Sequence, residues 1–111
     1  MEITTKQYKH CDLLSIQGKV DSYTAPDLTK AIESLNDNGQ FKIVLDLTEL
    51  EYMSSAGFRA LLIGQRNCKR YNRGEIVLAR VPKKIKDALE LTGFTPLFKM
   101  FDDVTAAVGG F

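Results

Sequence analysis

The apolar residues of this chain fall into short continuous runs and into segments with helical spacing. Residues 43–47 and 76–79 are nearly unbroken apolar runs, which is typical of parallel strands that are covered on both faces of a sheet. Residues 3–10 and 13–18 are strand-like and are separated by a turn at residues 10–12. They therefore predict an N-terminal β-hairpin.

Helix signals lie between and after these strands. The first helix has strong start signals: Thr24 as a cap, Pro26 in the first turn, and Asp27 placed to complement the helix dipole. The residue pattern predicts helices at residues 24–35, about 55–71, 82–92 and 104–108, with a short edge strand at residues 98–101.

The predicted order of elements is ββαβαβαβα. Strands that alternate with helices favour an α/β domain, because right-handed crossovers place successive strands side by side and parallel. The hairpin adds an antiparallel part, so we expect a mixed sheet of about five strands with about four helices. With 111 residues and no linker or repeat, the chain is predicted to be a single domain over residues 1–111.

Composition and charge exclude several classes of function. There are 15 basic and 14 acidic residues, giving a net charge of +1, so we expect no direct binding of nucleic acid. No apolar run approaches membrane-spanning length, and no signal-peptide core is present, so we expect no membrane insertion. Cys11 and Cys68 fit no metal spacing and are expected to be free, buried or half-buried thiols in a cytoplasmic protein.

Catalytic chemistry lacks its usual residues. His10 is the only histidine, and it lies in the predicted hairpin turn, so the serines at residues 54 and 55 have no base to activate them. The chain contains no phosphate-binding glycine loop and no cluster of metal ligands. We therefore expect neither an enzyme nor a cofactor.

The predicted helix at residues 55–71 has two contrasting faces when it is wound at about 100° per residue. Small and apolar residues face the sheet: Gly57, Ala60, Leu61, Gly64, Cys68 and Tyr71. The opposite face carries Arg59, Arg66, Arg70 and Arg73, with Phe58 and Leu62 on a flank. This face is either an ordinary solvated surface or a docking surface for a partner with an acidic groove.

Ser54 and Ser55 stand where this helix begins. One interpretation is that they only cap the helix. The other is that one of them is phosphorylated, because a phosphate there would meet free N–H groups and the positive end of the helix dipole. A phosphate would add nearly two negative charges and expel a bound partner without unfolding the domain. The same helix end could also hold the phosphate of a small ligand.

Three segments resemble the STAS domain, which is found in bacterial anti-sigma factor antagonists. Ile43–Leu62 resembles the family signature, Gly18–Leu28 resembles its second characteristic segment, and Leu89–Phe98 resembles the third. The resemblance runs nearly end to end and has the same order of elements.

The resemblance implies a mechanism. An unphosphorylated domain binds an anti-sigma factor that is also a serine protein kinase of the histidine-kinase-like ATPase type, and so releases a sigma factor. Phosphorylation ends binding, and a serine phosphatase restores it. Ser55 matches the phosphorylated position, while Ser54 stands where the family usually has aspartate and is the second candidate.

The resemblance also implies a partner-binding surface. It comprises Asp21, Tyr23, Thr24, Met53, Ser54, Ser55, Ala56, Gly57, Phe58, Arg59 and Leu62. The alternative is a constitutive binding or scaffold subunit, for example of a transport or stress complex, in which the two serines only cap the helix.

Overall fold

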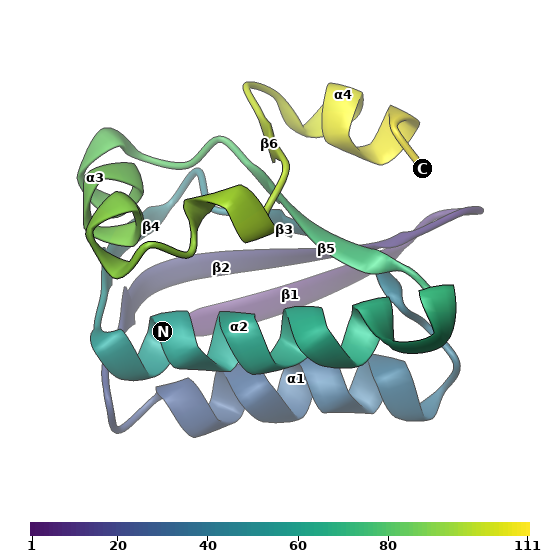
Figure 1. The fold of residues 1–111 in the computed structure, drawn as a ribbon, viewed down its shortest axis with the longest axis horizontal. Coiled ribbons are helices and arrows are strands. Elements are labelled where there is room, and N and C mark those ends of the chain that lie inside the picture. The colour runs from purple at the N-terminus through teal and green to yellow at the C-terminus, as the bar shows by residue number, and fades with distance from the viewer.

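Six strands and four helices follow one another in the computed structural model, which describes residues 1–111 (Figure 1). The strands are β1 (Glu2–Gln7), β2 (Asp12–Val20), β3 (Lys42–Asp46), β4 (Leu50–Met53), β5 (Glu75–Ala79) and β6 (Met100–Phe101). The helices are α1 (Ala25–Asp37), α2 (Ser55–Lys69), α3 (Lys83–Thr92) and α4 (Val104–Gly109), with 3-10 turns η1 (Arg70–Asn72) and η2 (Thr95–Leu97).

The strands form one mixed sheet in the order β1-β2-β3-β5-β6, which confirms the predicted α/β fold. β1 pairs with β2 antiparallel, and the β2–β3, β3–β5 and β5–β6 pairs are parallel. β4 is a sixth strand that the sequence pattern missed. It runs parallel to Gly18–Val20 at the end of β2, with a register shift between Gly18 and Lys19. Only Leu50 and Met53 of β4 are buried, so its pattern neither alternates nor forms an apolar run.

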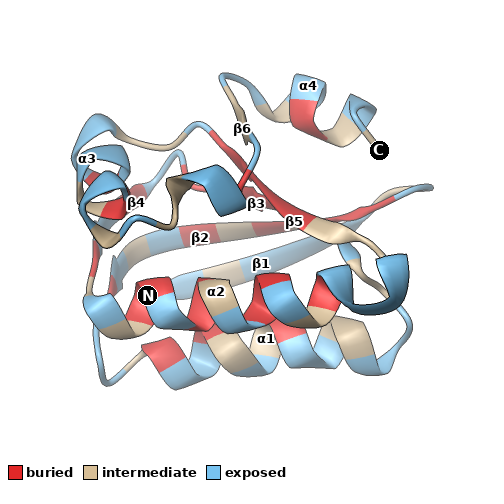
Figure 2. Cartoon of the chain, in the orientation of Figure 1, coloured by how far each residue is buried: buried red, intermediate tan, exposed pale blue.

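The sheet is covered on both faces. Figure 1 shows α1 and α2 side by side on one face and α4 on the other. Ile43 and Leu45 belong to the large core cluster on the side of α1 and α2, whereas Val44 packs with Ala107 of α4. All three β3 residues are fully buried, as the apolar run predicted. Figure 2 shows β5 almost wholly buried and the edge strand β1 largely exposed.

Helix α2 lies close to its neighbours because two of its residues are glycines. A Cβ atom at Gly64 would lie 3.0 Å from Cδ1 of Ile76 and 3.2 Å from Ile32. This confirms the predicted face of small residues, with one correction. Tyr71 is not on that face: α2 ends at Lys69, and Tyr71 has a φ of 60° and is 84% exposed.

Gln65 is a buried polar residue that joins three parts of the fold. Its Nε2 donates hydrogen bonds to the carbonyl oxygens of Ile76 (3.0 Å) and Leu97 (2.7 Å). Its Oε1 accepts one from the N–H of Ile76 (2.6 Å). The side chain therefore holds α2 to β5 and to η2.

Replacing Gln65 with Leu should lower the free energy of unfolding by about 2–4 kcal/mol, because buried backbone groups lose their partners. The measurement is chemical denaturation followed by circular dichroism. Arg66→Leu on the exposed side of the same helix is the matched control and should change stability by about 0.5 kcal/mol or less. Equal losses for the two variants would contradict the role given to Gln65.

Asp12 begins β2 and is buried, and its Oδ2 has no hydrogen-bond partner. Burial raises the pKa of this carboxyl above its ordinary value, because the charged form loses its hydration. The folded protein thus holds the proton more tightly than the unfolded chain does. The resulting stabilisation is present below the unfolded pKa and is lost as pH rises through the folded pKa.

Asp12→Asn should therefore raise the midpoint of thermal unfolding at neutral pH, and this gain should shrink as the pH is lowered toward the ordinary carboxyl range. Thermal unfolding curves recorded across that range test it. Asp37→Asn, at an exposed position, should show no such trend. A gain that is the same at every pH would show that charge burial is not its cause.

Candidate functional site

The two adjacent serines have different surroundings. Ser54 is the N-cap of α2: its Oγ accepts a hydrogen bond from the N–H of Gly57 (3.4 Å), and its carbonyl oxygen accepts one from Phe58 (3.1 Å). Ser55 is the first residue of the helix and is exposed, and its hydroxyl makes no hydrogen bond within the chain. The N–H groups of Ser55 and Ala56 are also without a partner in the chain. Only Ser54 is therefore tied into the helix start.

The loop before α1 is held by Asp21. Its carboxylate accepts hydrogen bonds from the N–H groups of Tyr23 and Thr24 (both 2.9 Å) and from the Thr24 hydroxyl (3.1 Å). The backbone N–H of Thr24 is the main cause that lowers the pKa of the Asp21 carboxyl, and these other donors add to it. The loop is thus locally ordered while Tyr23 remains 89% exposed.

The prediction that the Thr24 side chain caps α1 was wrong. Thr24 occupies the N-cap position, but its side chain forms no capping hydrogen bond. Its Oγ1 instead accepts from the backbone N–H of Asp21 (3.0 Å). The hydroxyl is used inside the loop, so it is not available to the helix.

A hydrogen bond connects the serine turn to this loop. The N–H of Ser54 donates to the carbonyl oxygen of Val20 (2.8 Å), the residue that immediately precedes Asp21. Because β2 and β4 are parallel, their carboxyl ends meet at one edge of the sheet. Two segments separated by more than a helix and a strand in the sequence therefore form one surface.

A shallow groove of about 420 Å³ continues this surface between α1 and α2. It is lined by Ser22, Ala25, Pro26, Thr29, Lys30 and Glu33 on one side and by Ala56, Arg59, Ala60 and Ile63 on the other. We call the Asp21–Thr24 loop, Ser55 and this groove the candidate docking surface. The α1 side of the groove was not predicted from the sequence. The spacing of Pro26, Lys30 and Glu33, which places them on one face of a helix, could have indicated it.

The residues expected to contact a partner differ in how far they are exposed. Asp21, Tyr23, Ser55 and Arg59 are exposed, and Thr24, Ser54, Ala56 and Leu62 are half-buried.

Met53, Gly57 and Phe58 are buried, so the expectation that they contact a partner directly is corrected. A Cβ atom at Gly57 would lie 2.5 Å from Cγ of Met53, and Phe58 belongs to the large core cluster. These three residues support the serine turn from below.

The predicted row of arginines on α2 is shorter than expected. Arg59, Arg66 and Arg70 are exposed and form no salt bridge. Arg73 lies beyond the end of α2 and folds back: its guanidinium donates to the carbonyl oxygens of Arg70 (3.0 Å) and Asn67 (2.6 Å) and stacks on Phe41. Arg73 therefore closes the carboxyl end of the helix and is not part of the row.

Other kinds of site find no support in the chain. None of its helices combines the length and the apolar character that crossing a membrane requires. His, Cys, Asp and Glu side chains form no group of three or more that could hold a metal ion. Cys11 and Cys68 are free and buried, and His10 is exposed in the predicted turn between β1 and β2. Burial raises the pKa of both thiols.

Comparison with known proteins identifies the family. The model of the STAS domain matches residues 2–107. The chain belongs to the STAS domain family. It is 30% identical to BtrV of Bordetella bronchiseptica, a candidate anti-sigma factor antagonist, over 100% of this chain and 95% of that protein.

Solved structures share this STAS fold. An anti-sigma factor antagonist from Mycobacterium paratuberculosis superimposes with a TM-score of 0.86 at 20% identity, covering 98% of this chain and 92% of that one. The Bacillus cell fate determinant SpoIIAA in its phosphorylated form superimposes with a TM-score of 0.78 at 14% identity, covering 98% of each chain.

Because only Ser54 caps α2 of this STAS domain, the two serines should differ in their effect on stability. Ser54→Ala should lower the free energy of unfolding by about 0.5–1 kcal/mol, the low end for a cap, since its hydrogen bond is long. Ser55→Ala should change it by about 0.5 kcal/mol or less. Denaturation of the two single variants in parallel measures this. A larger loss for Ser55→Ala would reverse the assignment of the cap.

Proposed function

We propose that this STAS protein is an anti-sigma factor antagonist whose binding is switched off by phosphorylation of Ser55. The observation that carries the proposal is the division of roles between neighbouring serines. Ser54 is engaged as the cap, whereas Ser55 is exposed within the candidate docking surface and its hydroxyl makes no hydrogen bond in the chain. A kinase can reach that hydroxyl without disturbing the helix start.

A phosphate on Ser55 fits its surroundings. The free N–H groups of Ser55 and Ala56 and the positive end of the α2 dipole favour a negative group there. Arg59 lies one helical turn further on, is exposed, and has no acidic partner in the chain. Residues four apart on a helix are neighbours, so this guanidinium can pair with the phosphate. The modified domain can therefore stay folded.

The partner in this proposal is an anti-sigma factor that carries serine-kinase activity and presents an acidic, partly apolar surface. Tyr23 and Ile63 offer exposed apolar contacts, and aromatic side chains often carry much of the binding energy of an interface. Arg59 and Lys30 bring two positive charges to the groove lining, against one negative charge from Glu33. Phosphorylation of Ser55 would repel an acidic partner and would also neutralise Arg59.

The relatives support this assignment, because several are named as anti-sigma factor antagonists and one of the same fold is known in a phosphorylated form. In this account the protein is a binding module, not an enzyme, and a separate serine phosphatase restores binding. An ATP-dependent kinase acts in the cytoplasm, so the proposal places this protein there.

The test is phosphate transfer from labelled ATP in a lysate of the source organism. Wild type and Ser54→Ala should become labelled, and Ser55→Ala should not. A known phosphoprotein labelled in the same lysate serves as the positive control. If label is lost only with Ser54→Ala, the phosphorylated residue is Ser54 and not Ser55. If wild type is not labelled, the alternative of a constitutive binding or scaffold subunit is favoured.

Binding to the kinase identified in this way is the second measurement. Ser55→Asp should weaken the affinity at least about tenfold, which corresponds to about 1.4 kcal/mol, because a negative charge lies within the interface. Ser55→Ala should bind like wild type. Thr105→Asp, at an exposed position on α4, is the charge-matched control on the other face of the sheet. An unchanged affinity of Ser55→Asp would contradict the proposal that phosphorylation of Ser55 switches binding off.

A further inference from the structure

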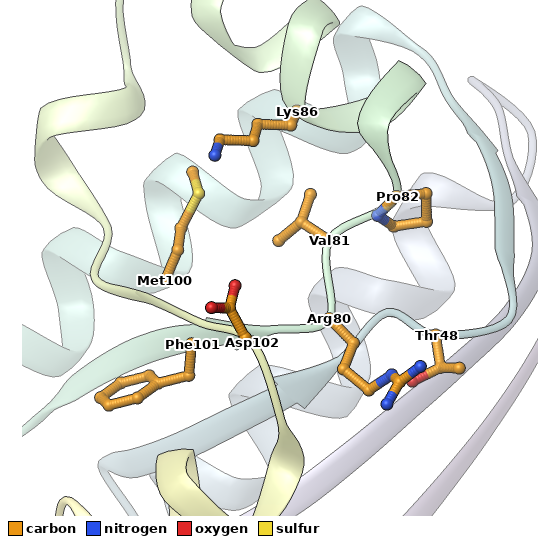
Figure 3. A pocket seen from close by; sticks show the side chains of 8 residues that line it. All are labelled: Thr48, Arg80, Val81, Pro82, Lys86, Met100, Phe101 and Asp102. Atoms are coloured by element: carbon orange, nitrogen blue, oxygen red, sulfur yellow. The ribbon is translucent and has the colours of Figure 1, made fainter.

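A second concave site lies at the carboxyl ends of three parallel strands, and it shares no residue with the candidate docking surface. It has a volume of about 380 Å³. Its lining residues are Thr48, Arg80, Val81, Pro82, Lys86, Met100, Phe101 and Asp102 (Figure 3). Thr48 lies after β3, and residues 80–82 lie after β5. Met100 and Phe101 form β6, Asp102 follows that strand, and Lys86 belongs to the first turn of α3. In open α/β sheets the crevice beyond the carboxyl ends of the strands is the usual place for a ligand.

The charges of this pocket favour an anion. Arg80 and Lys86 are exposed, and neither takes part in the two salt bridges of the chain, which join Lys83 to Asp87 and Lys99 to Glu75. Helix α3 begins immediately after Pro82, a residue of the lining, and has no side-chain cap, so the positive end of its dipole lies beside the pocket. Asp102 is the only acidic residue in the lining, and the balance is one positive charge in excess.

The backbone at Arg80 is in an unusual conformation for a residue with a side chain. Its φ is 54°, in the left-handed region that costs about 1–2 kcal/mol for residues other than glycine. The N–H of Arg80 donates to the carbonyl oxygen of Phe101 (2.9 Å), which fixes the residue between β5 and β6. Glycine would fit this position without strain. An arginine there places a guanidinium at the pocket at a cost to stability.

Apart from Thr48, the uncharged residues of the lining are apolar. Val81, Pro82 and Met100 are half-buried, and they supply a wall against which a ring or an alkyl group can pack, whereas the Phe101 ring packs toward α4. Figure 3 shows Lys86 extending from α3 and Arg80 from the end of β5, on different sides of Val81. The two cations therefore flank the apolar wall.

From these features we propose that the pocket binds a small organic anion, in which a phosphate or carboxylate group is joined to an apolar body about the size of an aromatic ring. Lys86 binds the charged group, Arg80 on the other side of Val81 adds to the positive potential of the pocket, and Val81 and Met100 pack against the apolar body. The volume suits a molecule of this size and excludes a macromolecular partner from the interior of the pocket.

The test uses phenyl phosphate as the probe and amide chemical shifts of the full chain as the readout. Titration at millimolar concentrations should give saturable shifts at Thr48, at residues 80, 81 and 83–86, and at residues 100–102. Arg80→Gly, which suits the positive φ, and Lys86→Gln should each weaken binding at least tenfold. Lys84→Gln, exposed on the same helix but outside the pocket, should leave the affinity unchanged.

Two further probes separate the parts of the ligand. Inorganic phosphate should shift the same residues with lower affinity, since it lacks the apolar body, and benzyl alcohol should not bind saturably, since it lacks the charge. Asp102→Asn should tighten the binding of phenyl phosphate, because it removes the one negative charge of the lining.

The proposal is overturned if phenyl phosphate gives no saturable shifts, if Lys84→Gln weakens binding as much as Lys86→Gln, or if benzyl alcohol binds as tightly as phenyl phosphate. Thermal unfolding of each variant is measured alongside. Should Arg80→Gly fail to fold, Lys86→Gln and Asp102→Asn, both at exposed positions, still decide the question through opposite changes in affinity.

Discussion

The hydrogen bond from the N–H of Ser54 to the carbonyl oxygen of Val20 is the contact on which the candidate docking surface depends. It ends the short parallel pairing of β2 with β4 and brings together the loop before α1 and the start of α2. Val20, Leu50 and Met53 lie buried beneath it, so the junction rests on the main core. Gly57 allows Met53 to fill the space below the turn, where a larger residue would collide with it.

A surface built in this way can change its charge without changing its shape. The backbone and the Oγ of Ser54 both form hydrogen bonds within the chain, whereas the hydroxyl of Ser55 forms none. In the proposed switch, a phosphate on Ser55 would therefore act on what approaches the surface and leave the junction intact. The anion pocket proposed at β3, β5 and β6 lies at the same carboxyl edge of the sheet, but it uses a different set of residues.

Much of the fold could be predicted because the central strands are buried on both faces and are therefore composed almost wholly of apolar residues. The apolar runs at β3 and β5 are buried on both sides, and Gly93, with a φ of 78°, ends α3 where the sequence predicts. The short strand β4 could not be predicted, since its two middle residues are exposed and its pairing needs a register shift in β2.

Several details of the candidate site could not be predicted from the sequence. Which serine caps α2 depends on where the helix begins to within one residue, and sequence spacing does not resolve that. Phe58 was expected on a flank because an isolated helical wheel ignores what packs around it, and the core reaches this side chain. Gln65 binds a carbonyl 32 positions away, which no local pattern can reveal. Arg73 turns back because the helix breaks at Tyr71.

The central claim is that phosphorylation alters this surface without refolding the domain. The most direct measurement compares amide chemical shifts of the unmodified chain with those of a chain that carries phosphoserine at position 55, with no partner present. The account predicts changes confined to residues 20–24 and 53–60, with the signals of β3 and β5 unmoved. Widespread changes through the core strands would contradict it, because the phosphate would then act by refolding the domain.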